Sequence, residues 1–202
     1  MFQLPTSTDI NKPLYKKAVF EKFNLKTVER DRFDADISRM ALVARVSTAT
    51  VPALTKGKEI EGFYVLQVAL KRKDYDQKNI LLLQKLIPQK IVFALQYEGQ
   101  TQFCIFHTRL QQSEWMPTDG AVLSLQGLSL DDVWNNIVVT IGGLDTQADE
   151  SIEEQIIHRE QREKLLRQIE SLEKQCRNEK QTRKKYELHQ RLQDLKLKIK
   201  QV

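Results

Sequence analysis

Apolar residues follow two different spacings along this chain, and the change of spacing separates expected strands from expected helices. Residues 37–46 and 60–70 are rich in aliphatic and aromatic side chains, and the second stretch has almost no polar face. A strand of that kind is covered on both sides. Residues 90–97 and 101–108 form two more apolar stretches around Glu98-Gly99-Gln100. A connection this short around a glycine predicts a β-hairpin.

Helical spacing is found between and after these strands. Apolar residues recur at helical spacing over 80–87, where Asp74 or Asp76 is the expected N-cap and Pro88 ends the pattern. Ser129 followed by two acids predicts the start of a later helix, and Gly142-Gly143 predicts its end.

The first part of the chain has a weaker pattern. Residues 6–36 are expected to be mostly helical, with Pro13 in a first turn and Thr27 as an N-cap. Together these elements predict an α+β domain over residues 1–148, with a small mixed β-sheet, a β-β-α-β-β core and packed helices.

The remaining residues, 149–202, predict a helical tail. Ser151 and Glu154 have the spacing of a capping box. Apolar residues then recur at heptad spacing in two seams, Leu165, Ile169 and Leu172, and later Leu188, Leu192, Leu195, Ile199 and Val202. The polar stretch between the seams favours a bend, so that the seams cover each other in an antiparallel hairpin. One long helix in a coiled coil, with its seam filled by a partner helix on Leu188, Leu192, Leu195 and Ile199, is the alternative.

Net charge is confined to the tail. Residues 1–150 contain 18 basic and 18 acidic side chains, whereas residues 176–202 contain 9 basic and 3 acidic ones. Five cations fall within nine residues of the tail, namely Arg177, Lys180, Arg183, Lys184 and Lys185. A second basic group, Lys71-Arg72-Lys73, follows the strand at 60–70 and is itself followed by acids. Lys71, Arg72 and the five tail cations are therefore candidates for contact with nucleic-acid phosphates, although most charge runs are simply soluble surface.

No pattern in the sequence supplies a catalytic, metal or cofactor site. None of the three histidines accompanies a serine or cysteine at a glycine-flanked turn, and there is no glycine-rich phosphate loop. Cys104 and His107 are three apart on an expected strand, so their side chains point to opposite faces and cannot share an ion. We expect a buried cysteine there.

A degenerate metal-dependent nuclease is the enzymatic alternative. It would place Asp34 or Asp36 beside Gln67 and Lys71, but a cation needs more carboxylates than this set offers. The chain has only two cysteines, so we expect a reducing cytoplasm as its location. It has no long apolar run, so we expect no insertion into a membrane.

Several segments resemble a known bacterial family. They are residues 33–37 (FDADI), residues 70–73 (LKRK), the break at residues 86–88, residues 91–97 (IVFALQY) with their glycine hairpin, and residues 172–188 of the tail. Together they are similar to the family labelled domain of unknown function 4391. The resemblance covers nearly the whole chain and carries no known catalytic residue.

Members of this family tend to be encoded near helicases and DNA methyltransferases of restriction-like systems. The resemblance therefore implies a non-catalytic accessory subunit of a DNA-acting or antiphage defence complex. Its partner would be a helicase or methyltransferase subunit, with DNA as a second candidate.

Overall fold

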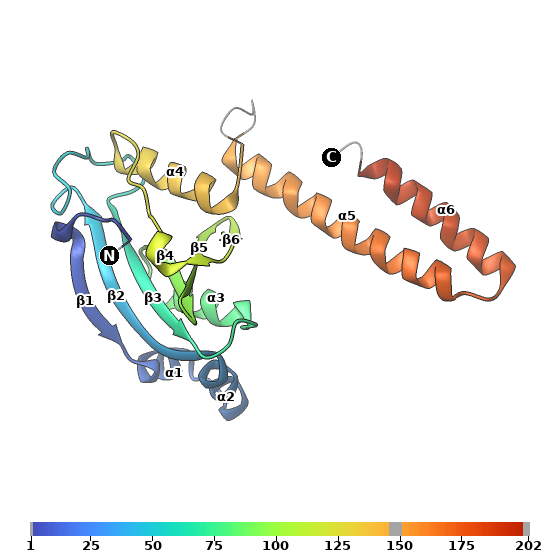
Figure 1. Cartoon of the computed structure of the whole chain (residues 1–202), viewed down its shortest axis with the longest axis horizontal. Coiled ribbons are helices and arrows are strands. Elements are labelled where there is room, and N and C mark those ends of the chain that lie inside the picture. Colours follow the sequence, from blue (N-terminus) through green and yellow to red (C-terminus); the bar gives the residue numbers. More distant parts are fainter. Residues whose placement is uncertain (1, 146–150, 200–202) are drawn as a thin grey trace. The chain divides into compact units, whose positions relative to one another are not determined.

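The chain divides into two compact units, which we call the body (Met1–Thr146) and the tail (Gln147–Val202). The computed structural model describes residues 2–145 and 151–199, and Figure 1 shows their elements. The predicted boundary at residues 148 and 149, and Val202 of the second seam, lie outside the described residues.

One mixed sheet forms the centre of the body. Its strands follow the chain in the order β1-β2-β3-β4-β5-β6, and β7 pairs with β5. All neighbouring strands are antiparallel except β3 and β4. The strands are β1 (Asp9–Leu14), β2 (Ile37–Ser47), β3 (Gly62–Leu70), β4 (Lys90–Tyr97), β5 (Gln100–His107), β6 (Arg109–Gln112) and β7 (Met116–Pro117). The predicted α+β fold is confirmed, and β1, β6 and β7 are added to the predicted core.

The prediction of a mostly helical segment at 6–36 is wrong for its first part. Asp9–Leu14 is a strand at the edge of the sheet, and the helices begin only with α1 (Lys16–Phe23) and α2 (Thr27–Asp36). Pro13 is compatible with this strand because an edge residue need not donate to a neighbour. Thr27 is the first helical residue and not the N-cap, since that position belongs to Lys26, whose backbone N–H donates to Glu29.

Helices α1, α2 and α3 (Gln77–Leu86) enclose a core on one face of the sheet. Val19, Phe33 and Leu83 from the three helices join a buried cluster with Leu66 and Phe93 of the sheet. Helix α3 also makes the crossover that the parallel pair β3 and β4 requires. It begins where expected, because the Asp76 side chain accepts a hydrogen bond from the backbone N–H of Lys78.

Helix α4 (Leu130–Gly142) supplies Trp134 to the opposite face. The Trp134 ring lies 5.6 Å from Phe63, which alternates on β3 with residues of the first core. Ser129 caps this helix and Gly143 ends it with φ of 58°, as the sequence predicts. Strand β3 is therefore buried on both faces, which explains its almost continuous apolar sequence.

The tail is an antiparallel hairpin of α5 (Ile152–Asn178) and α6 (Thr182–Lys198), joined by residues 179–181. Ser151 and Glu154 form the predicted capping box at the start of α5. Ile169 on α5 and Leu192 on α6 are only 9% and 6% exposed, and Lys196 pairs with Glu173 across the two helices at 2.8 Å. Within the described residues, no helix combines the length and apolar character needed to span a bilayer.

Candidate nucleic-acid interface

The basic group of the body is largely engaged within the protein. Arg72 Nε donates to a carboxylate oxygen of Asp36, a residue with no exposed surface. The other oxygen of Asp36 accepts hydrogen bonds from the backbone N–H of Asp76 at 2.8 Å and from Asn79 Nδ2 at 2.7 Å. Arg72 is thus the countercharge of a buried carboxylate, which is costly to leave unpaired.

The flanking lysines differ from each other. Lys73 Nζ donates to Gln100 Oε1 at 2.8 Å and lies 5.2 Å from the centre of the Trp115 ring. Lys71 is exposed, and its backbone N–H donates to the backbone oxygen of Asp36 at 2.7 Å. Of the two body residues predicted to contact phosphates, Lys71 therefore has the freer side chain.

The carboxylates and the amide of the nuclease alternative are bonded to other residues of the body. Asp34 pairs with Lys16 at 2.6 Å, Gln67 donates to Gln96, and Asp36 is occupied as described above. Among the residues that the structure describes, no three His, Cys, Asp or Glu side chains are placed to hold a metal ion.

A polar network beside β5 was not predicted. The Tyr75 hydroxyl donates to Gln102 Oε1 at 2.9 Å and accepts from Gln112 Nε2, and Gln77 donates to Gln112 at 3.0 Å. It fastens the segment before α3 to β5 and β6. Gln100 and Gln102 lie on the same face of β5, a strand whose middle is apolar. Polar residues at alternate positions of such a strand are the signal that could have revealed this network.

Cys104 lies next to this network as a core residue. It has no exposed surface, and burial raises the pKa of its thiol to about 12. Its sulfur is 3.7 Å from the Tyr75 hydroxyl, whose own pKa is raised chiefly by burial. The expectation of a buried cysteine is confirmed, and a thiol with so high a pKa is a poor nucleophile.

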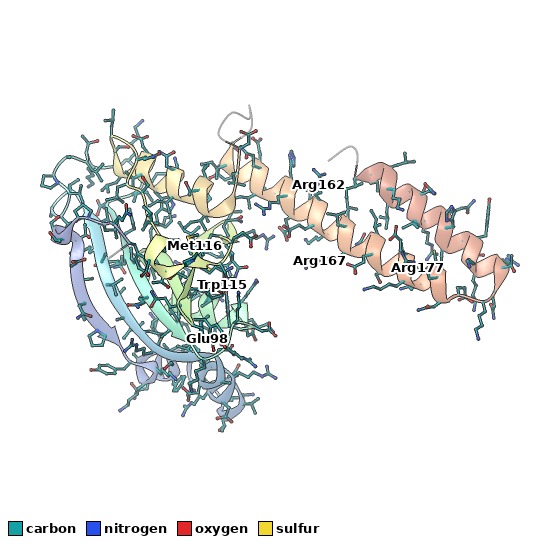
Figure 2. All side chains as sticks on the ribbon, viewed as in Figure 1. Glu98, Trp115, Met116, Arg162, Arg167 and Arg177 are labelled. Atoms are coloured by element: carbon teal, nitrogen blue, oxygen red, sulfur yellow. The ribbon has the colours of Figure 1, made fainter. Side chains whose placement is uncertain are left out.

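The tail cations surround the turn between α5 and α6. Arg177 lies in the last turn of α5 (Figure 2), and Arg183, Lys184 and Lys185 lie in the first turns of α6. Arg183 is 94% exposed and approaches Glu187 only to 3.6 Å. In residues 151–199, no carboxylate comes within 4.0 Å of the other four predicted cations, Arg177, Lys180, Lys184 and Lys185.

The start of α6 is compensated by one acid that precedes the helix, since the carboxylate of Glu179 accepts a hydrogen bond from the backbone N–H of Gln181 at 2.8 Å. The N-cap residue Gln181 makes no capping side-chain bond, and the first turn contains no acid. A helix N-terminus favours negative charge, yet here it carries cations. The hairpin end therefore carries more exposed cations than acids that pair with them within the described residues.

The predicted partner-binding seam lies inside the hairpin. Leu192 is buried, and Leu188, Leu195 and Ile199 are half-buried. A partner helix could fill this seam only if the hairpin opened. The large apolar residues that α5 and α6 leave exposed, Leu166, Tyr186 and Leu197 among them, lie elsewhere on the helices.

Comparison with known proteins gives one match. The family model described as domain of unknown function (DUF4391) matches residues 2–199. Neither a curated protein nor a solved structure matches the chain.

Proposed function

The chain belongs to the domain of unknown function (DUF4391) family, and we propose that it is a non-catalytic, cytoplasmic accessory protein of a bacterial DNA-acting complex. Its tail would contact the phosphate backbone of nucleic acid. The complex would be a restriction-like or antiphage defence system, as the genomic setting of the family suggests.

One observation carries the nucleic-acid part of the proposal. Four exposed cations lie around the connection between α5 and α6, and none has an ion-pair partner in the described tail. They are Arg177, Lys180, Lys184 and Lys185. Cations held by the fold and left uncompensated attract a polyanion, and the release of its counterions provides the binding free energy. Because such contacts do not read bases, we propose binding without sequence preference.

A helicase or methyltransferase subunit is the second proposed partner, through the outer surface of the hairpin. The specific observation is that Leu166 and Leu197 are 50% and 60% exposed although α5 and α6 already cover each other. Apolar residues on the outside of a closed hairpin can anchor another protein.

Salt-dependent binding of a short duplex to the full chain tests the first proposal. Changing Arg183, Lys184 and Lys185 together to Ala should weaken binding equally for unrelated sequences. It should also lower the slope of log affinity against log salt by about one unit per lost contact. The matched control changes three exposed body lysines, Lys17, Lys78 and Lys85, to Ala, and should leave the slope unchanged. An equal loss in both triple variants would contradict the assignment to the tail.

The non-catalytic assignment has its own test. We expect no cleavage of the same duplex in Mg²⁺ or Mn²⁺. Cleavage by the purified chain that disappears in Lys71→Ala would overturn it, because Lys71 is exposed and its loss should not disturb the fold.

A further inference from the structure

A groove runs between α5 and α6 near the turn of the hairpin. Its volume is about 620 Å³. It is lined by stripes of residues three or four apart on each helix, which are Ser171, Lys174, Gln175 and Asn178 of α5 and Lys184, Glu187, Leu188 and Arg191 of α6, with Glu179 between them. This spacing places each set on one helical face.

The acidic and the basic groups of this groove differ in what they already bind. Glu179 accepts a hydrogen bond from the backbone N–H of Gln181 at 2.8 Å, and Glu187 faces Arg183. Lys174 is paired with Glu170 at 2.8 Å. The two carboxylates and one of the three cations are therefore engaged in contacts of the hairpin itself.

The other polar side chains of the groove can donate hydrogen bonds and have no hydrogen-bond partner inside the described tail, although the hydroxyl and the two amides can also accept. They are the hydroxyl of Ser171, the side-chain amides of Gln175 and Asn178, the ammonium of Lys184 and the guanidinium of Arg191. Lys184 is also the third residue of α6, whose uncapped N-terminus adds a positive partial charge. Among these side chains, the N–H and O–H donors outnumber the oxygen acceptors. Such an excess of donors favours an anion with several oxygens.

We propose that this groove binds a phosphate group, with Arg191 and Lys184 supplying charge and Asn178 and Gln175 supplying neutral donors. The proposal rests on the proposed function, since it names the place on the tail where one backbone phosphate is held. It goes further in one respect: binding would depend on uncharged amides and on the planar fork of Arg191, not on charge alone.

Neutral substitutions separate a built phosphate site from general attraction to a basic surface. Gln175→Ala together with Asn178→Ala changes no charge, and Arg191→Lys keeps the charge but removes the fork. Arg162→Ala is the control, because Arg162 is an exposed cation of α5 that does not line the groove (Figure 2). Far-UV circular dichroism should show the same helix content in all variants.

The expected result is a loss of duplex affinity of about tenfold in the double amide variant and in Arg191→Lys. Arg162→Ala should lose less than either, although it removes a full charge. Normal binding by both groove variants would overturn the groove site while leaving the proposed function intact. Absence of duplex binding in the unmodified chain would overturn the proposed function.

Titration with inorganic tripolyphosphate and with the duplex distinguishes the two sources of a phosphate group. Binding of both, with the same loss in the groove variants, supports a site for backbone phosphate that also accepts a free one. Groove-dependent binding of tripolyphosphate without any duplex binding would overturn the assignment to nucleic acid and indicate a small phosphorylated ligand.

Discussion

Two basic triplets of the same composition have different surroundings in this protein. In the body, Arg72 of the Lys71-Arg72-Lys73 group is the countercharge of buried Asp36, and Lys73 lies against Gln100 and Trp115. In the tail, the Arg183-Lys184-Lys185 group has one distant approach to an acid, from Arg183 to Glu187. Two of the three body cations are bonded within the fold, whereas the tail triplet has this single ion pair within the described residues.

The difference arises from contacts that are distant in the sequence. Asp36 and Arg72 are 36 residues apart, and no local pattern connects them. In the tail, Arg183 approaches Glu187 one turn further along the same helix, and no carboxylate of residues 151–199 lies within 4.0 Å of Lys184 or Lys185. A basic run therefore indicates binding only when the fold leaves it without a partner.

The largest effect should come from opening the hairpin that presents the tail triplet. Leu192→Asp places a carboxylate at a buried position, which should cost more than about 3 kcal/mol and unfold the tail. Far-UV circular dichroism should show the loss of helix. Tryptophan fluorescence should be unchanged, because Trp115 and Trp134 both belong to the body.

Leu197→Asp is the matched control for this variant. It makes the same chemical change on the same helix at a residue that is mostly exposed. Helix content should stay at the wild-type level. Equal helix loss in both variants would show that Leu192 is not the centre of the hairpin core.

The next effect tests the body triplet. Arg72→Ala leaves the Asp36 carboxylate buried without its cation, so the free energy of unfolding of the body should fall by about 2–3 kcal/mol. Lys71→Ala, its exposed neighbour, should change it by less than about 0.5 kcal/mol. Urea unfolding followed by tryptophan fluorescence measures both. Similar stability of the two variants would show that the bond from Arg72 to Asp36 does not stabilise the body, so that the two triplets would not differ in this respect.

Much of the fold was predictable because its signals are local. Asp76, Ser129 and Ser151 cap the helices that they were expected to cap. The β4–β5 hairpin is also found, with Glu98 and Gly99 at positive φ in its turn. These residues act on their immediate neighbours, so their types and spacing are sufficient.

The strands that were missed have no such signal. β1 is exposed along nearly its whole length, and β7 has two residues. Neither has the apolar alternation that marks a half-buried strand, because each lies at a margin of the sheet. The tail cations could be named from the sequence, whereas the bond from Arg72 to Asp36 and the groove beside Arg191 depend on three-dimensional neighbours.

A smaller effect is expected from supplying the missing cap of α6. Gln181→Asp would place an acceptor at the N-cap and a negative charge at the positive helix end, which should stabilise the hairpin by about 1 kcal/mol. The same change should weaken duplex binding, because it provides an internal anion beside the triplet. Thermal unfolding of the tail and salt-dependent binding measure the two effects, and a gain in both would show that an anion added at this end does not compete with the duplex.

The smallest effect concerns the ion pair between Lys196 and Glu173, which joins α5 and α6 within the described tail. The hydrogen bond and charge of Lys196 lower the pKa of Glu173 from its ordinary value of 4.5. A carboxyl whose pKa is lower in the folded state stabilises that state above its unfolded pKa and loses this contribution as the pH falls through the folded value. The hairpin should therefore lose some helix below about pH 4.5, and Glu173→Gln should flatten this part of the titration. An unchanged acid titration in Glu173→Gln would show that the pair with Lys196 does not contribute to the stability of the hairpin.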